Sequence, residues 1–125
     1  MKKYLLPAAA LMLGIAAPAL AHPKLVSATP AANTAVSSTN VITLSFSERL
    51  LPRLSGVEVT MIGMPGMANH APMKIAGLKT AIGEDGKTLV TRFPRPLAAG
   101  TYKVDWHVVS ADTHRINGSL TFTVR

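Results

Sequence analysis

The sequence of 125 residues contains no cysteine. Disulfide bonds, cysteine-based zinc sites and thiol catalysis are therefore excluded. A blue-copper centre is excluded as well, because that site requires a cysteine thiolate. If the chain is exported to an oxidising compartment, its stability must come from packing alone.

Charged residues make up only 15% of the chain and aromatic residues 5%, with a net charge of +7. Without Lys2 and Lys3, eleven lysines and arginines remain against six acidic residues, a net charge of about +5. These charges are scattered, with neither a basic run nor the interleaved aromatic residues that nucleic-acid-binding proteins present. We therefore expect no nucleic-acid partner.

A long apolar run occurs only at the start of the chain. Two lysines precede an apolar segment over residues 5–20, which ends in the small-residue motif Ala19-Leu20-Ala21. This order is typical of a secretory signal peptide. Two prolines and a glycine make the run a poor membrane anchor, and no later segment approaches the roughly 18 apolar residues that a span requires. We expect residues 1–21 to be removed and residues 22–125 to form one exported domain without stable membrane insertion.

The rest of the chain alternates between apolar and polar residues, and no long segment repeats with the helical period. The expected strands cover residues 24–27, 41–47, 56–62, 75–81, 88–93, 101–109 and 118–125. Their inward side chains would be Ile42, Leu44, Phe46, Val57, Val59, Met61, Leu89, Phe93, Tyr102, Val104, Trp106, Val108, Leu120, Phe122 and Val124. About seven short strands in some 100 residues predict an all-β fold, either a Greek-key sandwich or a small barrel.

Sulfur and imidazole groups recur at every third position in one short segment. Met61, Met64, Met67, His70 and Met73 follow this period, and proline and glycine between them disfavour a helix or a regular strand. Thioethers are soft, uncharged ligands that select Cu(I). A second interpretation is an apolar loop that contacts a partner, with Met61 simply continuing a strand into the core. The residues alone leave both interpretations open.

His22 would become the first residue once the leader is removed. Its α-amine and ring nitrogen could then chelate one metal ion. Pro23 has no backbone N–H, so the route in which Cu(II) displaces the next amide proton is closed and the amine–imidazole chelate remains. The alternative is a frayed terminus, as in most domains.

Asp112 and His114 follow the strand predicted over residues 101–109. Side chains at positions i and i+2 of an extended segment project to the same side, so the carboxylate and the imidazole could converge on one ion. Oxygen and nitrogen donors suit Cu(II) or Zn(II). The alternative is an ordinary polar turn in which Asp112 accepts backbone hydrogen bonds.

Glu48 follows the inward parity of the strand over residues 41–47. It either pairs with Arg49 at the rim of the fold or contributes to a metal site. His107 has the outward parity of its strand, so we interpret it as a surface histidine outside any site.

Several motifs together resemble the CopC/PcoC family of periplasmic copper-binding, copper-resistance proteins. The resemblance covers essentially all of residues 22–125. The motifs are His22-Pro23 after the leader, Ser27 to Pro30, Leu44-Ser45-Phe46-Ser47-Glu48, Met64-Pro65-Gly66-Met67, Ala99 to Trp106, Val108 to His114, and Gly118 with the final strand.

The resemblance implies a Greek-key β-barrel of cupredoxin or immunoglobulin-like type with two copper sites at opposite ends. The implied Cu(II) ligands are His22, through its amine and ring, Asp112 and His114, with Glu48 as a further ligand. The implied Cu(I) ligands are Met61, Met64, Met67, His70 and Met73. One residue more than in the family pattern separates Met67 from His70.

The function that follows is that of a periplasmic copper carrier in copper resistance or homeostasis. It would exchange copper with periplasmic or inner-membrane copper-handling proteins, and we expect a monomer. No nucleophile–base arrangement is visible, so we expect no enzyme. Two alternatives stay open: a copper-dependent oxidative enzyme that uses a histidine brace, and a structural β-sandwich without metal.

Overall fold

The computed structural model describes residues 22–67 and 71–125. Within them the fold is all-β, as predicted. The strands are β1 (Leu25–Thr29), β2 (Ala35–Val36), β3 (Val41–Phe46), β4 (Gly56–Gly63), β5 (Met73–Lys74), β6 (Lys79–Ile82), β7 (Thr88–Arg92), β8 (Gly100–Val109) and β9 (Arg115–Val124). The helical element among these residues is the short 3-10 helix η1 (Pro52–Leu54), and none of the described helices is long and apolar enough to cross a membrane.

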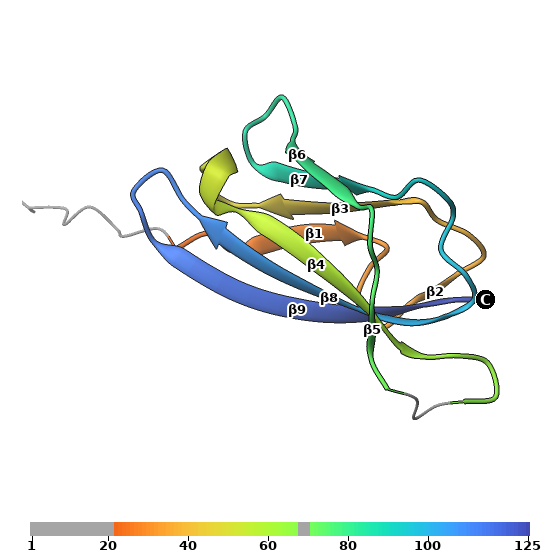
Figure 1. Ribbon diagram of the computed structural model, residues 1–125. Helices are drawn as coiled ribbons and strands as arrows, with labels where there is room; N and C mark the ends of the chain where they lie inside the picture. The colour runs from red at the N-terminus through yellow and green to blue at the C-terminus, as the bar shows by residue number, and fades with distance from the viewer. Residues whose placement is uncertain (1–21, 68–70) are drawn as a thin grey trace, which may run out of the picture.

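The strands form two sheets that pack face to face (Figure 1). The order is β1-β3-β7-β6 in one sheet and β2-β9-β8-β4-β5 in the other. Neighbouring strands are antiparallel, except that β2 runs parallel to β9. The chain repeatedly crosses between the sheets, from β3 to β4, β5 to β6 and β7 to β8. With two separate sheets, the fold is the Greek-key sandwich, one of the two all-β folds that the sequence left open.

The core lies between the two sheets and contains all the side chains predicted to face inward, together with Leu50 and Leu97. On β3, Ile42 and Leu44 are at most 1% exposed, and on β8 Val104 and Val108 are completely buried. Burying one such side chain contributes roughly 1.5–3 kcal/mol relative to leaving it in water. A core of this kind stabilises the domain without disulfide bonds.

Two differences from the predicted strands have local causes. The strand expected over residues 75–81 is only partly present: β6 begins at Lys79, and the unpredicted β5 precedes the expected range and belongs to the other sheet. Gly77, with a positive φ of 78°, lies between them and allows the chain to leave one sheet for the other. The short β2 was not predicted, so the described residues contain nine strands instead of about seven.

The two ends of the sandwich carry different functional candidates. The turn between β8 and β9 lies at one end, together with η1 and the start of the described chain (Figure 1). Backbone contacts hold this end together, since Leu50 bridges to Ser110 and Leu51 N–H donates to Val109 O at 2.8 Å. The turn that carries Met64 and Met67 lies at the other end (Figure 1).

Candidate metal centre

The segment that begins at His22 is anchored to the end of β3. Ser47 makes this anchor: its Oγ accepts from Lys24 N–H at 2.9 Å and lies 3.5 Å from His22 O. Ser47 N–H also donates to Lys24 O at 2.8 Å, and Pro23 is fully buried. These contacts hold residues 22–24 against the end of β3 in the full-length chain, in which His22 is not the terminus.

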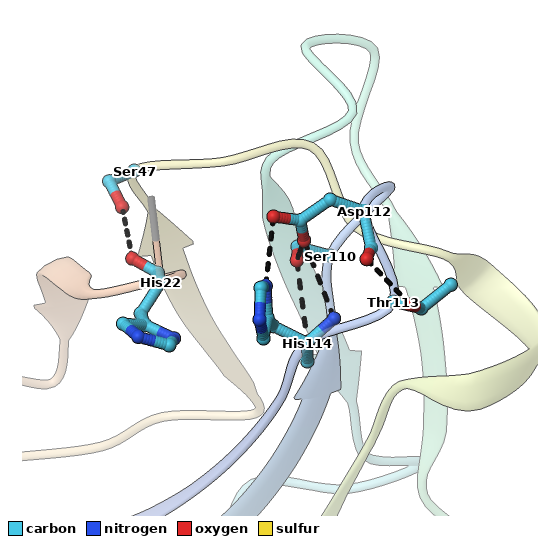
Figure 2. Close-up of polar contacts among 6 residues, drawn as sticks. All are labelled: His22, Ser47, Ser110, Asp112, Thr113 and His114. Atoms are coloured by element: carbon cyan, nitrogen blue, oxygen red, sulfur yellow. Dashed lines mark hydrogen bonds and ion pairs between the residues drawn. The ribbon is translucent and has the colours of Figure 1, made fainter. Parts of the chain in front are cut away.

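This anchor brings the imidazole of His22 beside that of His114 (Figure 2). The ring centroids lie 4.8 Å apart and the planes meet at 69°. In the described parts of the chain, the ring nitrogens of His22 have no hydrogen-bond partner. The expected proximity of His22 to His114 is therefore present. The ring nitrogens of His22 are also available to bind a metal ion.

Asp112 fixes the orientation and the tautomer of His114. Its Oδ2 lies 2.9 Å from His114 Nδ1. Because an ionised carboxylate only accepts hydrogen bonds, the Nδ1 atom must carry the proton. When the imidazole is neutral, its Nε2 atom then has a free lone pair, the usual arrangement of a histidine that binds a metal.

The reason given from sequence for this convergence was wrong. Asp112 and Thr113 are not part of an extended strand but lie in the turn between β8 and β9. Thr113 has a left-handed backbone with φ of 73°, and its N–H donates to Ser110 O at 2.8 Å. The turn, rather than the i, i+2 geometry of a strand, brings the carboxylate to the ring.

The pKa of Asp112 is lowered from its ordinary value of 3.8 to about 2. The main cause is the hydrogen bond from the Ser110 hydroxyl, followed by that from the His114 ring. Asp112 is therefore ionised throughout the physiological pH range, as both a hydrogen-bond acceptor and a metal ligand must be.

Glu48 lies at the same end, between Ser47 and Arg49. Arg49 O accepts from Ala111 N–H at 3.0 Å, so this segment runs beside the β8–β9 turn. Glu48 is half-buried, and the described residues provide no ion-pair partner for it, Arg49 included. Pairing with Arg49, the alternative interpretation, is not observed.

His22 lies beside His114 and His114 contacts Asp112, while Glu48 lies in the neighbouring segment, and together they do not form a finished site. Among residues 22–67 and 71–125, no three histidine or acidic side chains are arranged as a ready metal-binding group. Binding one ion at this end therefore requires a side-chain rotation, for which the exposed ring of His22 is the least restrained.

At the other end, the period of three in the sequence becomes two cross-strand pairs of methionines. Met64 and Met67 form an antiparallel bridge, with N···O distances of 3.1 and 2.9 Å. Pro65 and Gly66, the latter with φ of 78°, make the turn between them, as in a type II turn. Met61 on β4 is the direct partner of Met73 on β5. Side chains of directly opposed residues lie on the same face, so each pair can present two thioethers together.

The four methionines differ in exposure. Met64, Met67 and Met73 are 42%, 57% and 55% exposed, whereas Met61 is 6% exposed and belongs to the core. Met61 and Met73 both line an open hollow of 340 Å³, with Phe93, Leu97 and Tyr102 among its other walls. His70, the remaining predicted ligand, lies outside the described residues.

Sequence reasoning assigned no role to two serines that organise the first site. Ser47 holds the His22 segment, and Ser110 donates to Asp112 Oδ1 (Figure 2). Both serines lie in motifs of the family resemblance, which was the available signal. His107 lies on the outer face of the sheet, with its ring packed over Gly56, as its parity predicted.

The fold is a small Greek-key β-sandwich with the His22, Asp112 and His114 side chains at one end and exposed methionines at the other. The CopC domain model matches residues 25–125, and the chain belongs to this family.

Curated relatives and solved structures agree with this assignment. The chain is 50% identical over 115 residues to copper resistance protein C of Escherichia coli, covering 92% of this chain and 90% of the relative. It is 51% identical over 109 residues to copper resistance protein C of Xanthomonas campestris pv. juglandis, covering 87% and 84%. The crystal structure of PcoC, a methionine-rich copper resistance protein from Escherichia coli, matches with a TM-score of 0.76 and 48% identity, covering 84% of this chain and all of that one.

Proposed function

We propose that this protein is a periplasmic copper carrier of copper resistance or homeostasis, with a Cu(II) site at the His22 end and a Cu(I) site at the methionine end. The observation that carries the proposal is the 4.8 Å approach of the His22 and His114 rings at the end of the sandwich opposite the methionine turn. The relatives that are named copper resistance proteins support copper as the metal.

The donors at the first end suit Cu(II). After removal of residues 1–21, His22 offers an amine and a ring nitrogen. His114 offers Nε2, and Asp112 offers a carboxylate oxygen once its side chain rotates away from His114 Nδ1. Imidazole and amine nitrogens together with a carboxylate oxygen bind Cu(II) in preference to soft ions such as Cu(I). Glu48, in the segment that runs beside the β8–β9 turn, would supply a further oxygen.

The donors at the second end suit Cu(I). Thioethers are uncharged and soft, so they bind Cu(I) without competing for protons and discriminate against harder divalent ions. The exposed Met64, Met67 and Met73 are accessible as they stand, and Met61 borders the hollow beside Met73. His70 completes the proposed set.

The proposal extends to location and partners. Residues 1–21 act as the export signal, and residues 22–125 exchange copper with periplasmic or inner-membrane copper-handling proteins. The role is transport, not catalysis, because His114, Asp112 and Glu48 would fill positions that an oxygen-activating copper enzyme must leave open.

The decisive experiment is a titration of protein beginning at His22 with Cu(II) and, separately and without oxygen, with Cu(I). We expect one equivalent of each ion, bound independently. Electron paramagnetic resonance should detect nitrogen ligands on Cu(II), and X-ray absorption should detect sulfur neighbours on Cu(I).

Two results would contradict the proposal. Loss of all copper during desalting would favour a structural sandwich. Copper-dependent oxygen consumption with a reductant, at a rate above that of free copper, would favour an oxidative enzyme.

A further inference from the structure

One serine holds both backbone groups of Lys24, the last residue before β1. Ser47 Oγ accepts from Lys24 N–H at 2.9 Å, and Ser47 N–H donates to Lys24 O at 2.8 Å. Lys24 is exposed, so its side chain adds little burial to this contact. The backbone of residues 22–24 is therefore held chiefly by Ser47, together with the buried ring of Pro23.

Ser47 is itself fixed by contacts on the other side of β3. Phe46, which precedes it, is buried, and its N–H donates to Lys87 O at 2.9 Å. Leu50, which follows it, is also buried, and its N–H donates to Gly86 O at 2.9 Å. These bonds tie the chain on both sides of Ser47 to the turn before β7. The position of the Ser47 hydroxyl is therefore set by the framework rather than by the segment that it holds.

Fixing Lys24 also restricts His22, because a single proline separates them. Proline has a fixed φ, and the residue before a proline is confined to extended backbone conformations. Ser47 Oγ lies 3.5 Å from His22 O, which adds a weak contact at the same place (Figure 2). His22 therefore has few backbone conformations left, and in the observed one its ring centroid lies 4.8 Å from that of His114.

We propose that Ser47 is a positioning residue of the Cu(II) site. It holds residues 22–24 so that, once residues 1–21 are removed, the amine and the ring of His22 lie beside His114 before the metal binds. Ordering a backbone residue has an entropic cost, and a site that is ordered in advance avoids this cost at the moment of binding. The copper part of this inference rests on the proposed function, whereas the ordering of residues 22–24 concerns the metal-free protein.

The test compares Ser47→Ala with the native sequence, both beginning at His22. Without metal, the amide hydrogen of Lys24 should exchange slowly with solvent in the native protein and faster in Ser47→Ala, because its acceptor is gone. Cu(II) affinity should fall by about 10-fold, the equivalent of ordering roughly one residue at binding. Cu(I) affinity should not change. Ser47→Thr, which keeps the hydroxyl, should restore native exchange and native Cu(II) affinity.

Ser45→Ala is the matched control. Ser45 has the same strand parity as Ser47, and its hydroxyl is hydrogen-bonded to that of Thr88 at 3.1 Å. This variant also loses a side-chain hydrogen bond at β3, but it does not touch residues 22–24. We expect native Lys24 exchange and native Cu(II) affinity.

A second amide separates positioning from a general disturbance of this end of the sandwich. Ala111 N–H donates to Arg49 O at 3.0 Å, so its exchange depends on the β8–β9 turn being in place. In Ser47→Ala the exchange of Ala111 should stay native. Faster exchange at Ala111 as well as at Lys24 would mean that the substitution disturbs the whole end, and it would overturn the positioning role.

The possible results separate this inference from the proposed function. Native Lys24 exchange or native Cu(II) affinity in Ser47→Ala would overturn the positioning role. If the native protein itself binds no Cu(II), the proposed function fails, and faster Lys24 exchange in Ser47→Ala would still support the ordering of residues 22–24. If Ser47→Ala does not fold, the native protein decides: slow Lys24 exchange supports the inference, and exchange as fast as in an unfolded peptide overturns it.

Discussion

The imidazole rings of His22 and His114 lie with their centroids 4.8 Å apart, although the residues stand near opposite ends of the described chain. The anchor at Ser47 and the turn that holds Asp112 bring them together from different sheets. A metal bound by both rings would therefore join the first residues of the domain to the β8–β9 turn.

The first prediction concerns the α-amine of His22. One glycine added before His22 converts the amine into an amide, which is a poor ligand, and leaves every side chain in place. We expect Cu(II) affinity to fall on the order of 100-fold, about 2.7 kcal/mol, with unchanged Cu(I) affinity. Competition titration with a chelator of known affinity measures the change.

The matched control for this experiment carries one glycine after Arg125 instead. It should bind Cu(II) like the native protein. Equal Cu(II) affinity in all three proteins would remove the amine from the ligand set.

The second prediction concerns the packing of Trp106, a residue of β8, against Gly118 of β9. A methyl group added at Gly118 would overlap Trp106 Cζ2, so Gly118→Ala must displace the indole. Overpacking of this kind costs typically 1–3 kcal/mol. Urea denaturation followed by the fluorescence of the single tryptophan should record that loss.

Gly83→Ala provides the control for Gly118→Ala. Its added methyl group would meet the nearest atom at 3.5 Å, an ordinary van der Waals contact. We expect a change within about 0.5 kcal/mol. A similar loss in both variants would mean that the contact with Trp106 is not the cause.

The strands could be predicted where apolar and polar residues alternate, because the apolar residues are then the buried ones. Leu44 and Val104 face the core because each lies at an inward position of a long strand with polar neighbours. The two-residue β2 pairs with the last residues of β9, and a segment so short has no periodicity of its own. Its existence depends on tertiary contacts that the local sequence does not encode.

The site was predictable in its residue types but not in its geometry. Asp112 and His114 were identified by their spacing, yet the same spacing at Asp105 and His107 produces no such contact. The difference comes from a left-handed residue in a turn and from a buried hydroxyl 2 positions before the aspartate. Both depend on the surrounding fold, and a pattern of spacings contains neither.

The third prediction is a pH dependence of stability at the turn before β7. The Asp85 carboxylate accepts from Lys87 N–H at 2.8 Å and from the Thr88 hydroxyl at 2.8 Å, which lowers the pKa of Asp85 below its ordinary value of 3.8. A lowered folded-state pKa contributes stability above the unfolded value and loses it as the pH falls toward the folded value. The free-energy difference between the native protein and Asp85→Asn should therefore be largest above pH 3.8 and shrink below it.

Urea denaturation at stepped pH measures this difference, with Glu84→Gln as the control. Glu84 lies in the same turn, and the described residues give its side chain no hydrogen-bond partner. A difference for Asp85→Asn that does not vary with pH would show that charge is not what stabilises the turn.

The fourth prediction separates the two ends by ligand softness. Replacing Met64, Met67 and Met73 by leucine keeps size and apolarity and removes the three exposed sulfur atoms. Stability should change by no more than about 0.5 kcal/mol, because these are surface positions. Cu(I) binding should be lost while Cu(II) binding persists, and His114→Ala should do the reverse.

The fifth prediction asks whether the buried sulfur of Met61 also binds Cu(I). Met61→Leu conserves volume, so it should cost less than about 1.5 kcal/mol although Met61 is in the core. Because Met61 is paired with Met73 across the strands and lines the same hollow, we expect the sulfur count in the X-ray absorption of the Cu(I) form to fall by one. An unchanged sulfur count would leave Met61 as a core residue alone and restrict the thioether ligands to Met64, Met67 and Met73.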